Sequence, residues 1–213
     1  MMKRLFLTRS GMTLMELLIT SVLVGIVTIG LIAAEQVVRM SRQSSARDNL
    51  VSTQMQAMML ALTTDISKTT GDYASTGIYL EDNPIPTVYL ASACFRYPYG
   101  DVNTYSDDRW SCWTFDMDSG ILLSCSNLNA PVSDCTASPG VQDWSSIKYT
   151  KLAISVIDNT GNYIPSTGLV TNSSVAYIRV RIITRYDTNK DADPISNPDY
   201  KLESNISPVG LSR

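Results

Sequence analysis

The sequence predicts an α+β fold: a long N-terminal helix, membrane-spanning in its first half, packed on an antiparallel β-sheet domain. Three observations support this fold class. The run from Leu17 to Ala34 carries no charge, the polar stretch after it repeats apolar residues at helical spacing, and the chain beyond Gly71 changes to short alternating runs and turn residues. A chain of 213 residues can hold one globular domain and an extra element.

The helix is predicted to run from Met12 to about Lys68 without interruption, because no proline or strong breaker occurs before Thr70. At 1.5 Å per residue its length is about 85 Å. We expect residues 12–38 to form the membrane or filament-core part and residues 39–70 an amphipathic continuation. The apolar residues that recur on one face of this continuation are Val51, Met55, Met58, Leu62 and Ile66.

The β-sheet domain is predicted to cover residues 71–213. The candidate strands are Thr87–Ala91, Ala93–Tyr97, Cys112–Asp116, Ile121–Cys125, Ile147–Ile157 and Ser174–Tyr186. In the last two, apolar residues alternate with polar ones, which is typical of half-buried antiparallel strands. The turn Asp116-Met-Asp-Ser-Gly120 is predicted to join two strands as a hairpin.

The composition removes several classes of chemistry. The chain has no histidine, so it has no Ser–His or Cys–His catalytic pair and no imidazole ligand for a metal. The sequence also contains no glycine-rich phosphate loop and no metal-ligand motif, so we expect no cofactor and no enzymatic activity. A formal charge of −3 argues against nucleic acid as the main partner.

The N-terminus admits three interpretations. A cleaved signal peptide needs a short apolar region and then small residues, but the apolar run here is long and Ile32 stands where a small residue is wanted. A plain membrane anchor accounts for the length but leaves the carboxylate of Glu16 unexplained. The third interpretation accounts for both features. Its residues are the basic Lys3, Arg4 and Arg9, then Gly11, Met12, Thr13, Leu14 and Glu16.

These residues resemble the type IV prepilin signal, with Met12 in the place of the more usual phenylalanine. The resemblance implies that a prepilin peptidase cleaves between Gly11 and Met12 and then methylates the amine of Met12. It also implies that Glu16 pairs with the terminal amine of a neighbouring subunit and sets the axial register of assembly. Otherwise, Glu16 extends to the lipid headgroups.

The membrane orientation follows from the resemblance rather than from charge. Basic residues flank both ends of the apolar run, with Arg39, Arg42 and Arg47 on the second side. The prepilin leader is read in the cytoplasm, which implies a single span in the inner membrane with the C-terminal domain outside. From there the subunit would enter a pilus or pseudopilus at the cell surface.

One class within the family is most similar: the minor pilin W and the type II secretion pseudopilin J. The segment from Leu62 to Gly71, with Asp65-Ile66, is similar to the class's Asp-Ile/Leu-Arg-x-Ala-Gly, although Lys68 stands near the usual arginine and Thr70 replaces alanine. The resemblance implies a minor pilin that primes assembly near the filament tip, or a secretion pseudopilin. The implied partners are other minor pilins, the major pilin, the prepilin peptidase and the inner-membrane assembly platform.

The four cysteines are expected to form two disulfides, because their number is even, the domain is exported and no C-x-x-C pair occurs. Of the three pairings, we favour Cys94–Cys112, on neighbouring strands, and Cys125–Cys135, which flank a turn-rich segment. Four buried thiols are the alternative.

Three further features could bind ligands. Asp187, Asn189, Asp191 and Asp193 place oxygens at alternate positions, which suits calcium, but the loop lacks the glycine and glutamate of an EF-hand and a plain turn is the simpler account.

A basic stripe of Arg179, Arg181 and Arg185, with Lys148 close by, could bind DNA or an acidic patch on another subunit, or simply face solvent. The loops Asp101–Asp108 and Ser126–Ser138 are candidates for a tip adhesin or DNA receptor.

Overall fold

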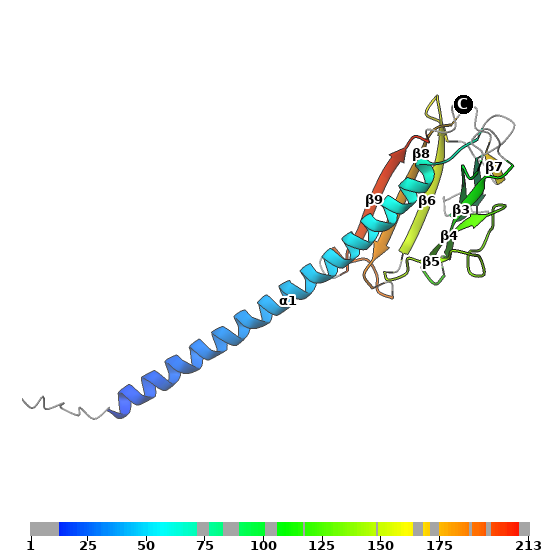
Figure 1. The fold of residues 1–213 in the computed structure, drawn as a ribbon. Coiled ribbons are helices and arrows are strands. Elements are labelled where there is room, and N and C mark those ends of the chain that lie inside the picture. Colours follow the sequence, from blue (N-terminus) through cyan, green and yellow to red (C-terminus); the bar gives the residue numbers. More distant parts are fainter. Residues whose placement is uncertain are drawn as a thin grey trace, which may run out of the picture. The chain divides into compact units, whose positions relative to one another are not determined.

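The computed structural model confirms the α+β fold, with one long helix and antiparallel sheets (Figure 1). The chain forms two compact units, residues 1–48 and residues 49–213, and helix α1 contributes to both. The structure describes residues 13–71, 77–82, 90–100, 106–116, 118–147, 149–163, 168–170, 175–187, 189–194 and 197–208.

Helix α1 runs from Leu14 to Ser67, so it ends one residue before the predicted end. Within the second unit its buried face is the one that the spacing predicts, because helical neighbours three and four residues apart share a face. The buried helical residues are Val51, Met55, Met58, Met59, Leu62 and Ile66. The predicted start at Met12 lies outside the described residues.

In the described part of the chain, nine strands form two antiparallel sheets. The first sheet has the order β5-β4-β3-β2-β1-β7 and the second has the order β6-β8-β9. The first sheet contains β1 Ile78–Asp82, β2 Leu90–Tyr97, β3 Arg109–Asp116, β4 Ile121–Leu128, β5 Gln142–Asp143 and β7 Gly168–Val170. The second sheet contains β6 Tyr149–Asp158, β8 Val175–Arg185 and β9 Asp199–Ile206.

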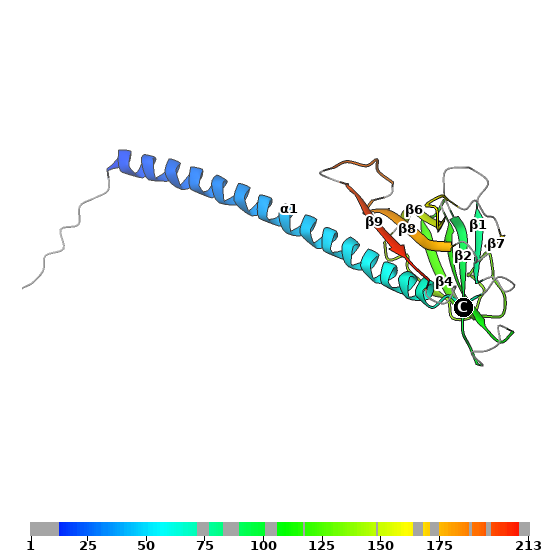
Figure 2. The same ribbon diagram turned by 90° about the horizontal axis from the view of Figure 1, so that it is seen from above.

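One hydrophobic core joins the buried face of the helix to one face of each sheet. We call these the inner faces. The first sheet contributes Ile78, Leu80, Ala93, Phe95, Trp113, Phe115 and Leu122, and the second contributes Leu152, Ile154, Val156, Ile178, Val180 and Ile182. Both views show β9 beside the helix (Figures 1 and 2), and Met55 and Tyr200 line one shallow groove between them.

The strand predictions need two corrections. Residues 90–97 form the single strand β2, rather than two strands that break near Ser92. A strand break was predicted at Ser92 because this residue is polar. In the structure Ser92 is buried within the strand, and its hydroxyl donates a hydrogen bond to the carbonyl of Val132. Residues 87–89 of the predicted strand lie outside the described part of the chain. The sequence analysis also missed β1, β5, β7 and β9.

Two glycines are required by the local backbone. Gly120 closes the predicted hairpin between β3 and β4 with φ 68°, and its amide donates to the carbonyl of Asp116 at 2.9 Å. At Gly77 a Cβ atom would lie 2.1 Å from the carbonyl oxygen of Thr70, so a side chain there would push apart the helix exit and the first sheet.

Candidate functional site

The N-terminus of α1 forms a capping box between Thr13 and Glu16. The Glu16 carboxylate accepts hydrogen bonds from the amide of Thr13 at 2.9 Å and from its hydroxyl at 3.0 Å. The amide of Glu16 in turn donates to the Thr13 hydroxyl at 3.3 Å. This reciprocal arrangement satisfies amides that a helix start leaves unpaired. Glu16 therefore has a local role in the helix, apart from any role in assembly.

The helix after Glu16 exposes an apolar surface within the first unit. Its large apolar side chains from Leu17 to Ile32 are about half or more exposed, and Ile29 reaches 70%. Its hydroxyl groups introduce no unpaired donors, because Thr20, Ser21 and Thr28 donate back to helix carbonyls at 2.8–2.9 Å. By length and composition alone, α1 can cross a membrane. The predicted cleavage and methylation residues, Gly11 and Met12, lie outside the described residues.

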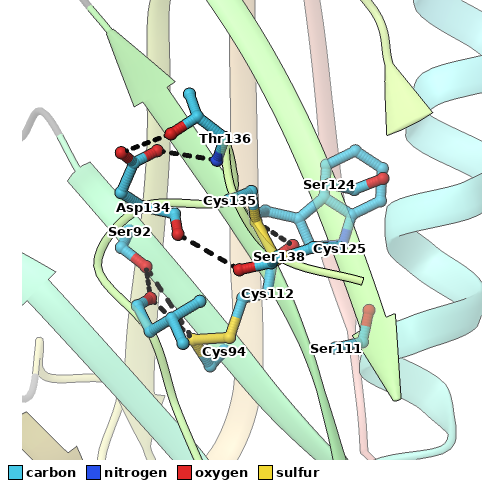
Figure 3. Close-up of a disulfide and its surroundings, with 12 residues drawn as sticks. Ser92, Cys94, Ser111, Cys112, Ser124, Cys125, Asp134, Cys135, Thr136 and Ser138 are labelled. Atoms are coloured by element: carbon cyan, nitrogen blue, oxygen red, sulfur yellow. Dashed lines mark hydrogen bonds between the residues drawn. A yellow bond between two sulfur atoms is a disulfide. The ribbon is translucent and has the colours of Figure 1, made fainter. Parts of the chain in front are cut away.

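The cysteines lie together on the outer face of the first sheet, opposite the core. Cys94, Cys112 and Cys125 are register partners across β2, β3 and β4. Disulfides join Cys94 to Cys112 and Cys125 to Cys135, which are the two pairs favoured from the predicted strands and the turn-rich segment (Figure 3). All four cysteines are at most 1% exposed, so the bridges belong to a small second core.

The loop Ser126–Ser138 is held against this second core. The Cys125–Cys135 bridge closes it, and the hydroxyl and amide of Thr136 donate to Asp134, which turns the chain near the bridge (Figure 3). These hydrogen bonds lower the pKa of Asp134 below its ordinary value. The loop is therefore tied to the first sheet through Leu128 and Cys135, while seven of its thirteen residues are exposed. A binding role for this loop stays a prediction.

The other predicted binding loop, Asp101–Asp108, is described only from residue 106 onward. Asp108 at its end is 6% exposed and pairs with Arg96 at 3.7 Å. It also accepts hydrogen bonds from the Thr70 hydroxyl at 3.2 Å and the Tyr99 amide at 3.3 Å. Asp108 thus joins the segment after the helix to the first sheet and is a structural residue.

A polar clamp that the sequence analysis missed holds the helix end to the first sheet. The Asp65 carboxylate accepts hydrogen bonds from the Ser111 hydroxyl at 2.7 Å and the Trp113 indole at 2.8 Å. Trp113 stacks on Trp144 at 5.5 Å, and the indole of Trp144 donates to Ser124. The available signal was the position of Asp65, three residues after the core residue Leu62 on the helix, because a partly buried carboxylate needs hydrogen-bond donors.

The arginines of the predicted basic stripe lie on one face, but carboxylates of the neighbouring strand β9 form ion pairs with them. Arg179, Arg181 and Arg185 lie on β8, on the face opposite the core. Arg181 forms an ion pair with Glu203 of β9 at 2.8 Å, and Arg185 forms one with Asp199 of β9 at 2.8 Å. Lys148 lies outside the described residues. The sequence analysis missed this arrangement because it did not predict β9.

The acidic loop after β8 is organised around an amide. The buried side-chain amide of Asn197 donates to the carbonyls of Asp187 at 2.8 Å, Lys190 at 3.3 Å and Asp191 at 3.2 Å. The Lys190 ammonium lies 3.1 Å from the Asp187 carboxylate and holds its pKa below the ordinary value. Within the described ranges, no three His, Cys, Asp or Glu side chains are placed to hold a metal ion. Calcium binding at Asp187, Asn189, Asp191 and Asp193 stays a prediction.

No protein-family model and no curated protein matches this sequence. Among solved structures, a type IV-like pilin from Thermus thermophilus is similar, with a TM-score of 0.52 and 8% sequence identity. The match covers 76% of this chain and 98% of that pilin. At this identity the likeness shows the fold, which is a type IV pilin-like α+β fold.

Proposed function

We propose that this chain is a type IV pilin-like subunit, and more specifically a minor pilin that helps prime filament assembly near the tip. The observation that carries the proposal is an exposed apolar helix that begins with the Thr13–Glu16 cap, in a chain with a type IV pilin-like fold. Such a helix needs a bilayer or other apolar helices around it.

In this proposal the prepilin peptidase cleaves between Gly11 and Met12 and methylates the new amine of Met12. The subunit waits in the inner membrane until the assembly platform extracts it. As apolar helices bundle and exclude water, the Glu16 carboxylate needs a cation, which the terminal amine of a neighbouring subunit supplies. In the structure the Glu16 carboxylate already accepts hydrogen bonds from the amide and the hydroxyl of Thr13. Docking would add a cation to those contacts.

Substitutions at the cap separate the two roles of Glu16. Glu16→Gln keeps a capping-box side chain and removes the charge, whereas Thr13→Ala weakens the cap and keeps the charge. We expect Glu16→Gln to lose filaments almost as completely as Glu16→Ala, and Thr13→Ala to retain most of them. Filament yield after shearing is the readout, with the membrane level of each variant as the control. Normal filaments with Glu16→Gln would exclude the charge-pairing role.

The primary test is mass spectrometry of sheared, purified surface filaments from cells that make this protein. A minor pilin appears at trace levels beside a major pilin, and its first peptide begins at methylated Met12. If filaments are abundant and the protein stays only in the membrane fraction, the secretion pseudopilin is the better assignment. A first peptide that begins anywhere other than Met12 contradicts the prepilin proposal itself.

A further inference from the structure

The outer face of the second sheet carries a row of charged side chains that are held by ion pairs across β8 and β9. Register partners place its side chains in three rows. The rows are Lys151, Ala153 and Ser155 on β6, Arg179, Arg181, Ile183 and Arg185 on β8, and Asp199, Lys201, Glu203 and Asn205 on β9. Five of these side chains are basic and two are acidic, in a chain whose formal charge is −3. This face is therefore positive on an acidic protein.

The arginine row is held in place by β9 and, at Arg179, also by the hydroxyl of Tyr177, to which its guanidinium donates at 3.2 Å. Glu203 contacts Arg181 at 2.8 Å and Arg179 at 3.5 Å, while Asn205 accepts a hydrogen bond from Arg179 at 3.3 Å. The arginine side chains nevertheless keep 40% and 54% of their surface exposed. Because the guanidinium groups are already oriented, a ligand would order little more side chain when it binds.

The opposite side of the arginine row is lined by small residues. Ala153 is the register partner of Arg181, and Ser155 is the register partner of Arg179. The β6 side of the arginine row therefore has no bulky side chain beside Arg179 and Arg181, and we call this stretch the shelf. Arg179 and Arg181 stand two positions apart on the strand, about 7 Å, so an extended segment with carboxylates at alternate positions matches their spacing.

We propose that this shelf on β6 and β8 binds an acidic segment of the next subunit in the filament, which rests on the function proposed above. Protein is favoured over nucleic acid because Asp199 and Glu203 stand among the basic residues. A polyphosphate backbone would be repelled by both acids along its track, whereas an acidic peptide can place two carboxylates on the β6 side of the arginines.

The test places a photo-crosslinking amino acid at Ser155 in the full chain, in cells that make filaments. We expect a crosslink to an acidic segment of another prepilin-like subunit, identified by mass spectrometry. Arg181→Glu should lower the crosslink yield at least tenfold. Lys68→Glu makes the same change in net charge at an exposed site at the helix end and should leave the yield unchanged.

A second pair of variants keeps the test valid if Arg181→Glu folds poorly. Ala153→Glu puts a carboxylate beside Arg181 and should block docking while adding an ion pair, whereas Ala153→Gln fills similar space without charge and should reduce the crosslink yield less.

Crosslinks to DNA or lipid, no crosslink, or yields insensitive to Arg181→Glu would each overturn the proposal. Analysis of membranes and sheared filaments separates the two proposals: a chain found in filaments with no Arg181-dependent crosslink sinks only this inference.

Discussion

The outer faces of the two sheets are built in opposite ways, although both sheets share one core. On the first sheet, the loop Ser126–Ser138 and two disulfides cover the outer face, and Cys112 and Cys135 are fully buried. On the second sheet the outer face is open, and ion pairs such as Arg181–Glu203 lie across it. The first face contributes to stability, and the second leaves charged groups available for contacts.

The comparison predicts that substitutions on the outer face of the first sheet lower the free energy of unfolding more than substitutions on the outer face of the second. Removing a disulfide lowers the free energy of unfolding strongly, because the unfolded chain regains the conformational freedom that the bridge removed. Exposed ion pairs lose little, because water and salt already screen them. The following substitutions test this difference, beginning with the largest expected effect.

The double substitution Cys125→Ala/Cys135→Ala should lower the free energy of unfolding by about 3 kcal/mol, the amount expected for a bridge that closes a short loop. Denaturant unfolding of the full chain in detergent micelles, under oxidising conditions, measures this loss. The matched control is Cys94→Ala/Cys112→Ala, which should cost about as much. If both double variants unfold at the wild-type denaturant concentration, the outer face of the first sheet is not the stabilising one.

Asp65→Ala should cost about 2 kcal/mol, because the substitution leaves the Trp113 indole and the Ser111 hydroxyl without their acceptor. Asp65→Asn keeps one acceptor oxygen and should cost less. Chemical unfolding followed by tryptophan fluorescence measures the change in the free energy of unfolding, since Trp110, Trp113 and Trp144 all lie in or against the two cores. Asp118→Ala, at an exposed turn, is the control and should change stability by less than about 0.5 kcal/mol. Equal losses at Asp65 and Asp118 would exclude the clamp.

Much of the fold follows from sequence periodicity. The helical face with Val51 and Met58 and the alternation in β6 and β8 were predicted because each buries one continuous apolar surface. The strand β9 was missed because Asp199–Ile206 interleaves charged residues with only a few apolar ones. An edge strand packs one neighbour only and needs few apolar residues, so its pattern is weak.

The candidate site divides in the same way. The Thr13–Glu16 cap depends on residues three apart, so a local motif could have found it, although the sequence analysis considered Glu16 only for assembly or for contact with lipid headgroups. The Asp65 clamp joins residues 46 and 48 positions apart, and the arginine row depends on the register of β9. Long-range partners are decided by packing of whole elements, which the periodicity of one segment does not encode.

Tyr149→Phe tests the inner face of the second sheet. There, among the described residues, the Tyr149 hydroxyl is buried without an acceptor such as the one that Asp65 provides for Trp113. Within the described residues, the buried Tyr149 hydroxyl has no hydrogen-bond partner, and burial raises its pKa to about 12 from 10.0. Removing it should raise the free energy of unfolding by about 1 kcal/mol at pH 7. Differential scanning calorimetry measures the change.

The pH dependence of Tyr149 has a definite sign. The unfolded tyrosine ionises near pH 10 and the folded one near pH 12, so above pH 10 only the unfolded state is stabilised by losing the proton. The wild-type protein should therefore lose stability between pH 10 and pH 12, and Tyr149→Phe should lose less. A variant with the wild-type alkaline slope would show that Tyr149 is hydrated in the folded state.

Glu203→Gln should have the smallest effect, at most about 0.5 kcal/mol, because its pairs with Arg179 and Arg181 are exposed. Even this loss should shrink as salt rises, since screening weakens the pairs in the wild-type protein. A double-mutant cycle with Arg181→Gln, measured by denaturant unfolding at low and high salt, isolates the coupling. A coupling above about 2 kcal/mol would mean that the ion pairs hold the second sheet together as the disulfides hold the first. The arginines would then be structural, and their exposure would no longer argue for a contact with another subunit.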